Sequence, residues 1–123
     1  MSEGLSDMAL TAMFEGLRAQ IDAGGPACVE FFADDSRAVL IGVVLLPQPC
    51  GTAAPEGLRL SAATAQATGT GVPGFGSLKN GAGEEILSGR CAAGGVFALQ
   101  LEDSETVYPG GDLIFPGGPI GFA

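Results

Sequence analysis

Hydrophobic and polar positions alternate with a period of two along much of the chain between residues 58 and 115. The clearest example is the segment 96–102, in which Phe97, Leu99 and Leu101 alternate with small or polar side chains. This period is typical of a strand with one solvent-exposed face. Further strands are predicted at 27–33, 38–46, 58–61, 65–70, 75–78, 85–92 and 112–115. The chain is therefore expected to be mainly β.

Short glycine-containing turns separate several of these segments. Asn80-Gly81, Gly94-Gly95 and Gly110-Gly111 supply residues that accept the positive φ angles of tight hairpins. Strands joined by such turns run antiparallel. We therefore expect residues 27–115 to form an antiparallel β-sandwich with jelly-roll or Greek-key character.

A helical period of hydrophobic residues precedes the strands. Ser6 is suited to cap a helix N-terminus, and Gly24-Gly25-Pro26 is a helix stop signal. Apolar residues at spacings of three and four fall on one face between them: Leu10, Met13, Phe14, Leu17 and Ile21. The sequence thus predicts one N-terminal helix within residues 6–22. We expect its apolar face to pack against the β core rather than to bind a separate ligand.

The predicted strand 38–46 is apolar on both faces. A strand covered on both sides has this pattern, and so does one that leaves an apolar face for a neighbouring subunit. The following segment, 47–57, is proline-rich and is predicted to be a long loop. The last segment, 116–123, is predicted to be an extended tail whose apolar residues lie either on the chain's own surface or on a partner.

Length and charge limit the classes of partner. The chain of 123 residues has room for a single domain, 1–123. Its net charge of −9 comes from 14 acidic and 5 basic residues, and the basic residues are scattered singly, which argues against binding to nucleic acid or to an anionic membrane. The sequence begins without a signal-peptide pattern, and its longest apolar run is shorter than the ~20 residues of a membrane span. We therefore expect a soluble protein made in a cytoplasm.

Residues suited to catalysis or to metal binding are scarce. The absence of histidine excludes Ser-His-Asp and Cys-His catalysis and removes the commonest transition-metal ligand. Cys28, Cys50 and Cys91 show no CxxC spacing and are expected to be free thiols. The segment 69–74 matches GxGxxG, but we expect a loop between strands, because a dinucleotide site needs a helix to begin there. The acidic segment 102–105 offers the oxygen ligands that calcium prefers, so a weak calcium site there is an alternative. We predict no enzyme activity, no cofactor and no metal.

The order of segments resembles that of small structural proteins of tailed bacteriophages, of the head-decoration or cement type. The resemblance lies in the capped helix and its Gly-Gly-Pro stop, followed by these segments: Val29–Phe32, Ala65–Gly71, Phe75, Gly81–Gly83, Ile86–Gly89 and Val107–Asp112. It implies a jelly-roll-like sandwich that sits on an icosahedral shell. It further implies that the major capsid protein and copies of the chain itself, as a homodimer or homotrimer, are the partners. The expected location is the capsid exterior of a virion assembled in the host bacterial cytoplasm.

Independently of this resemblance, an acidic domain without catalytic groups is suited to making contacts. We expect the contacts to come from the terminal segments and from the proline-rich segment, through these residues: Leu5, Pro47, Pro49, Pro116, Ile120 and Phe122. A structural role in the phage tail or baseplate is one alternative. A carbohydrate- or receptor-binding module is another, although the chain has no Trp and a single Tyr to stack on a sugar.

Overall fold

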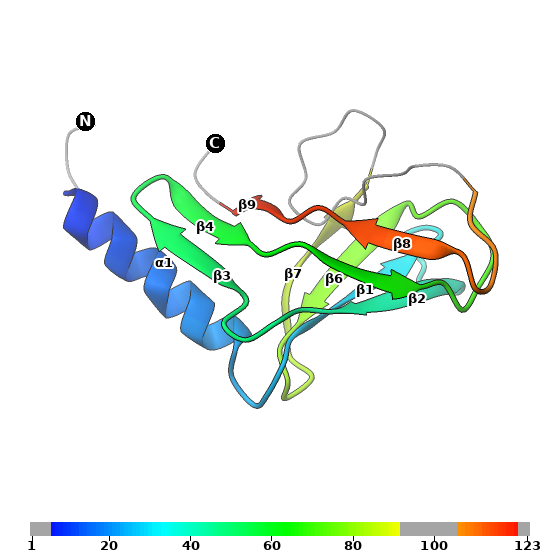
Figure 1. Cartoon of the computed structure of the whole chain (residues 1–123), viewed down its shortest axis with the longest axis horizontal. Coiled ribbons are helices and arrows are strands. Elements are labelled where there is room, and N and C mark those ends of the chain that lie inside the picture. Colours follow the sequence, from blue (N-terminus) through cyan, green and yellow to red (C-terminus); the bar gives the residue numbers. More distant parts are fainter. Residues whose placement is uncertain (1–5, 92–105, 121–123) are drawn as a thin grey trace.

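One helix and nine strands form the described part of the chain, residues 6–91 and 106–120 of the computed structural model (Figure 1). In chain order they are α1 (Asp7–Ile21), β1 (Cys28–Phe32), β2 (Leu40–Leu45), β3 (Gly51–Ala54), β4 (Gly57–Leu60), β5 (Ala63–Gln66), β6 (Phe75–Lys79), β7 (Glu85–Arg90), β8 (Asp112–Phe115) and β9 (Gly118–Ile120). All strand pairs are antiparallel. The prediction of a mainly β chain with one N-terminal helix is confirmed. The predicted strand 96–102 and the turn Gly94-Gly95 lie outside the described residues.

Local sequence signals determine both ends of α1. The Ser6 hydroxyl accepts a hydrogen bond from the Ala9 N–H at 3.2 Å, as expected of an N-cap. The helix ends at Ile21, and Gly24 and Gly25 follow with φ of 81° and 125°. Phe14 and Ile21 are buried against the strands β3 and β4. The predicted apolar face is too wide, however, because the Met13 side chain is 48 % exposed.

The largest sheet has the strand order β2-β1-β6-β7. β1 lies next to both β2 and β6, and β6 and β7 form the hairpin that Asn80-Gly81 predicted. The register of β2 against β1 shifts at Ile41, because Phe31 lies opposite Gly42 whereas Phe32 lies opposite Leu40. Ile41 is the extra residue of a β-bulge and is completely buried.

The hairpin turn between β6 and β7 is attached to the end of α1. The buried Asn80 amide accepts from the N–H groups of Ala82 and Glu84, at 3.1 and 2.9 Å, and its NH₂ group donates to the Gln20 carbonyl at 3.3 Å. The Gly81 N–H donates to the Ala23 carbonyl at 3.0 Å. A Cβ on Gly81 would collide with the Gly24 backbone, so glycine is needed here for a close approach as well as for the turn.

Two smaller sheets, β3-β4-β9 and β5-β8, lie opposite the large one. The prediction that 47–57 is an irregular loop was wrong, because Gly51–Ala54 pairs with Gly57–Leu60. The prolines at 47, 49 and 55 flank β3 without interrupting it, so its N–H groups stay available for the ladder. The tail lies on the chain's own sheet as far as residue 120, because β9 pairs with β4.

The predicted strand at 65–70 is displaced toward the N-terminus, since β5 spans Ala63–Gln66. Beyond it, the Ala67 N–H donates to the Gly111 carbonyl at 2.7 Å, and the N–H groups of Thr68 and Gly69 both donate to the Ile41 carbonyl. The chain therefore crosses from the smaller sheet to the edge of β2 at this point.

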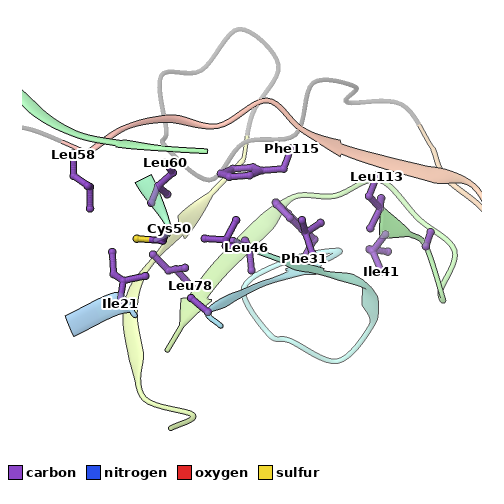
Figure 2. Close-up of a cluster of buried hydrophobic side chains, with 14 of the residues drawn as sticks. Ile21, Phe31, Ile41, Leu46, Cys50, Leu58, Leu60, Leu78, Leu113 and Phe115 are labelled. Carbon is purple, nitrogen blue, oxygen red and sulfur yellow. The ribbon is translucent and has the colours of Figure 1, made fainter. Parts of the chain in front are cut away.

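A single cluster of buried hydrophobic side chains fills the space between the sheets (Figure 2). Phe31 and Leu78 of the large sheet point toward Leu58, Leu60 and Phe115 of the smaller ones. Each of these side chains is at most 1 % exposed. The inner faces of the described sheets are thus used for packing, and the parts of these sheets that remain available to a partner are their outer faces and edges.

Candidate interaction surface

We call the side of the four-stranded sheet that faces away from the core the outer face. It carries every second residue, because neighbours such as Val29, Phe31, Val44 and Leu78 point into the core. The outer-face residues are Leu40, Val43 and Leu45 of β2; Cys28, Glu30 and Phe32 of β1; Phe75, Ser77 and Lys79 of β6; and Glu85, Ser88 and Arg90 of β7. The face divides into a charged half on β6 and β7 and an apolar half on β2.

Charged side chains on the first half are paired with one another. Lys79 Nζ lies 2.7 Å from Glu30 Oε1, and Arg37, from the turn before β2, lies 2.7 Å from Glu85 Oε1. Arg90 lies 3.5 Å from Asp35. Three of the five basic residues of the chain are therefore gathered here, although they are far apart in the sequence. Because each has an acidic partner, this half offers neither a free cationic site nor a free anionic one.

Arg37 is held in place by contacts of several kinds. Its guanidinium carbon lies 5.8 Å from the ring centroid of Phe32 and 5.1 Å from that of Phe75, which are cation–π distances. Its φ of 60° is unusual for a residue other than glycine.

The buried Ser77 hydroxyl donates to Glu85, and this bond, together with the Arg37 ion pair, lowers the pKa of Glu85. The Glu30 hydrogen bond raises the pKa of Lys79. On the charged half, the Arg37 guanidinium thus lies over the Phe32 and Phe75 rings and is held there by its ion pair with Glu85.

The apolar half is exposed. Leu45 is 66 % exposed and Leu40 39 %, whereas Val44 between them is completely buried. Val39, just before the strand, is 46 % exposed. The sequence contains no charged residue from 38 to 55, so this surface carries no charged side chain of its own. Exposed aliphatic side chains of this kind are typical of contact surfaces when they lie together.

β2 is also an edge strand of its sheet. The Leu46 N–H donates to the Ala27 carbonyl, so the backbone groups of residues 42, 44 and 46 face β1 and those of Val43 and Leu45 face away from it. Within residues 6–91 and 106–120, the N–H and C=O groups of Val43 and Leu45 have no hydrogen-bond partner. At the other end of β2, the edge is covered by Gly69, where a Cβ would collide with the Leu40 carbonyl.

A hollow lies between α1 and β3, away from this face. It is an open groove of about 480 Å³ lined by Glu15, Arg18, Asp22, Gln48, Pro49, Gly51 and Thr52. Arg18 is 3.1 Å from Glu15 and 3.0 Å from Asp22, and Asp22 also accepts from the Cys50 N–H at 3.0 Å. The polar groups of this groove are thus engaged in attaching α1 to β3, and we regard the groove as part of the scaffold.

Of the six predicted contact residues, four lie in the described part of the chain. Pro47 and Pro49 are exposed near the end of α1, and Pro116 is exposed between β8 and β9. Ile120 is half-buried and packs against the chain's own core. Leu5 and Phe122 lie outside the described residues. Their role in partner contacts stays a prediction.

Sequence reasoning did not predict the ion pairs on the outer face or the open edge of β2. The only sequence signal for the edge is the uncharged run 38–55, which was compatible with a central strand as well. The GxGxxG segment 69–74 is a loop between β5 and β6, as predicted, and no helix begins in it. The calcium possibility at 102–105 lies outside the described residues.

The thiols give no sign of a reactive site. Cys28 and Cys50 are free thiols. Burial raises the pKa of all three cysteines, to about 12 for Cys50 and about 11 for Cys91. In the described segments, Cys, Asp and Glu side chains form no group of three or more that would suit a metal ion. None of the helices there is both long enough and apolar enough to span a membrane.

Comparisons with protein-family models, with curated proteins and with solved structures found no match. The functional argument therefore rests on the surface described above.

Proposed function

We propose that this protein is a non-enzymatic structural component of a phage virion, most specifically a capsid decoration protein that bridges major capsid subunits. The observation that carries the proposal is the apolar, uncharged edge of β2, where Leu40 and Leu45 are exposed beside unpaired backbone groups. An edge of this kind favours contact with another protein, because natural monomers usually protect their edges with charge, proline or a covering segment. We also interpret the two facing layers of strands as a β-sandwich.

The charge of the chain supports a protein lattice as its partner. With a net charge of −9, each copy is attracted to a surface that presents basic residues and is repelled by nucleic acid. A small contact surface gives weak binding to one subunit, but a copy that touches several subunits of a shell gains from effective concentration. The order of segments that resembles head-decoration proteins is consistent with this role.

Binding to empty shells tests the proposal directly. We expect the purified full chain to sediment with shells assembled from the major capsid protein of the virus that encodes it, with saturation at a fixed ratio of copies. Leu45→Ser should weaken this binding several-fold, because it removes an exposed apolar side chain from the outer face. Ile114→Ser is the matched control, since Ile114 is also an exposed apolar residue but lies on β8, in the other layer.

Failure of the wild-type chain to sediment with shells, or equal effects of the two substitutions, would contradict the proposal. If the chain instead labels tails or baseplates in immunogold images of whole virions, the structural role holds and the location on the head is wrong. Specific binding on a glycan array would favour the receptor-binding alternative.

A further inference from the structure

We infer that two copies of this chain pair through the open edges of β2, antiparallel and across a two-fold axis at Val44. The inference deepens the proposed function, because it specifies how the chain would contact a copy of itself. It rests on the same edge but does not depend on binding to a shell.

The direction of the backbone groups selects the register. Within β2, only Val43 and Leu45 have both an N–H and a C=O group that point outward without a partner in the described segments. If Val43 lies opposite Leu45 of the partner subunit, each residue exchanges both main-chain hydrogen bonds with its opposite, and symmetry repeats the pair on the other side of the axis. A shift by two residues in one direction would place Val43 opposite Pro47 of the partner subunit, which has no N–H to donate. The same shift in the other direction would place Leu45 opposite Ile41 of the partner subunit, and the Ile41 carbonyl already accepts from the Thr68 and Gly69 N–H groups. Antiparallel self-pairing therefore has one register that satisfies every outward group.

Side chains on the outer face agree with this register. Leu45 and Val43 both point to that face, so each would lie beside the other's copy and form a cross-strand apolar pair. The pairing stays short, because Gly69 covers the edge at Leu40 and Ile41. An interface of this size belongs to the weak class, with dissociation constants of about 10 µM or above.

Charge explains why a second copy is suited to this edge. Two chains that each carry a net charge of −9 repel one another over most of their surfaces. Residues 38–55 carry no charge, so contact here brings the fewest like charges together. The opposite edge of the sheet, β7, carries Glu85 and Arg90, and β3 lies against α1. Of the two edges of the four-stranded sheet, β2 is thus the one at which self-association meets the least opposition.

Analytical ultracentrifugation of the full chain, from about 5 µM to about 1 mM, measures the association. We expect a reversible monomer–dimer equilibrium. Leu45→Lys should raise the dissociation constant at least tenfold, because it places two cations on facing strands. Thr52→Lys is the matched control: it makes the same change of charge at an exposed position on β3 and should leave association unchanged or slightly stronger. Circular dichroism verifies that both variants stay folded.

Amide hydrogen exchange followed by NMR supplies a second, position-specific readout. The N–H groups of Val43 and Leu45 should become protected as the protein concentration rises, whereas the Val44 N–H, which faces β1, should be protected at every concentration. A monomer at about 1 mM, a trimer, or a dimer whose Val43 and Leu45 amides exchange freely would each overturn the inference.

The two proposals fail separately. A chain that is monomeric in solution but still sediments with shells contradicts only the β2 pairing. A chain that dimerises through β2 but does not bind shells contradicts only the decoration role.

Discussion

Replacing Asp22 by alanine should destabilise the protein at the α1–β3 junction. The Asp22 carboxylate, whose side chain is 14 % exposed, accepts the N–H of the fully buried Cys50 at 3.0 Å and pairs with Arg18 at 3.0 Å. Alanine leaves the Cys50 N–H without an acceptor in a buried position. It also frees Arg18 from one of its two acidic partners.

The magnitude follows from these two losses. An unsatisfied buried N–H costs about 1–3 kcal/mol. The loss of the Arg18 pair adds little, since solvent screens it and Glu15 remains as a partner. We therefore expect a loss of about 2–3 kcal/mol in the free energy of unfolding. For a domain of this length, that loss lowers the melting temperature by roughly 10 °C.

Urea denaturation followed by circular dichroism measures the loss, and Asp22→Asn is the matched control. Asparagine keeps an oxygen that accepts from the Cys50 N–H but removes the charge, so it should cost less than about 1 kcal/mol. If alanine and asparagine destabilise the protein equally, the Cys50 hydrogen bond is not what holds the junction. A cost of alanine below about 0.5 kcal/mol would refute the reasoning altogether.

Three further predictions concern other parts of the fold. Asn80→Ala should cost about 2–3 kcal/mol in urea denaturation, because it leaves the Ala82 and Glu84 N–H groups without their buried acceptor, and a cost below about 0.5 kcal/mol would contradict this. Glu85 has a pKa below its ordinary value of 4.5, first through the Ser77 hydroxyl and then through Arg37, so its contribution is complete above pH 4.5 and is lost as the pH falls through the lower folded value. Glu85→Gln should therefore lose less stability on acidification than the wild type, as thermal melts below pH 5 would show, and an unchanged acid profile would contradict the assignment. The Cys50 thiol has a pKa of about 12 and no exposed surface, so at pH 8 it should react with a thiol reagent only as fast as the protein unfolds. Rapid labelling in native buffer would contradict this and would show that the α1–β3 junction opens locally.

The parts of the fold that the sequence predicted are those with local causes. The ends of α1 depend on Ser6 and on the glycines after Ile21, and the β6–β7 hairpin depends on Asn80-Gly81. All of these signals act over a few residues. β3 was missed because prolines on both sides of Gly51–Ala54 gave the whole segment the appearance of a loop.

The surface could not be predicted in the same way, because it depends on which strands become neighbours. Glu30 and Lys79 are paired only because β1 lies next to β6, and Arg37 reaches Glu85 across the same sheet. No pattern within one strand specifies that order. The apolar pattern of β2 was recognised from the sequence. Its position at an edge, however, follows from the pairing of β1 with β6 rather than from its own residues.

The attachment of the 80–82 turn to the end of α1 has a consequence for synthesis on the ribosome. Asn80 and Gly81 donate to carbonyls of Gln20 and Ala23, some 60 residues earlier in the chain. The C-terminal end of α1 therefore lacks these two hydrogen bonds until about two-thirds of the polypeptide has been made. Truncated chains that end between residues 60 and 80 already contain β3 and β4, against which α1 packs, but their 20–25 segment should be cleaved by proteases faster than in longer chains, because the turn that holds it is missing.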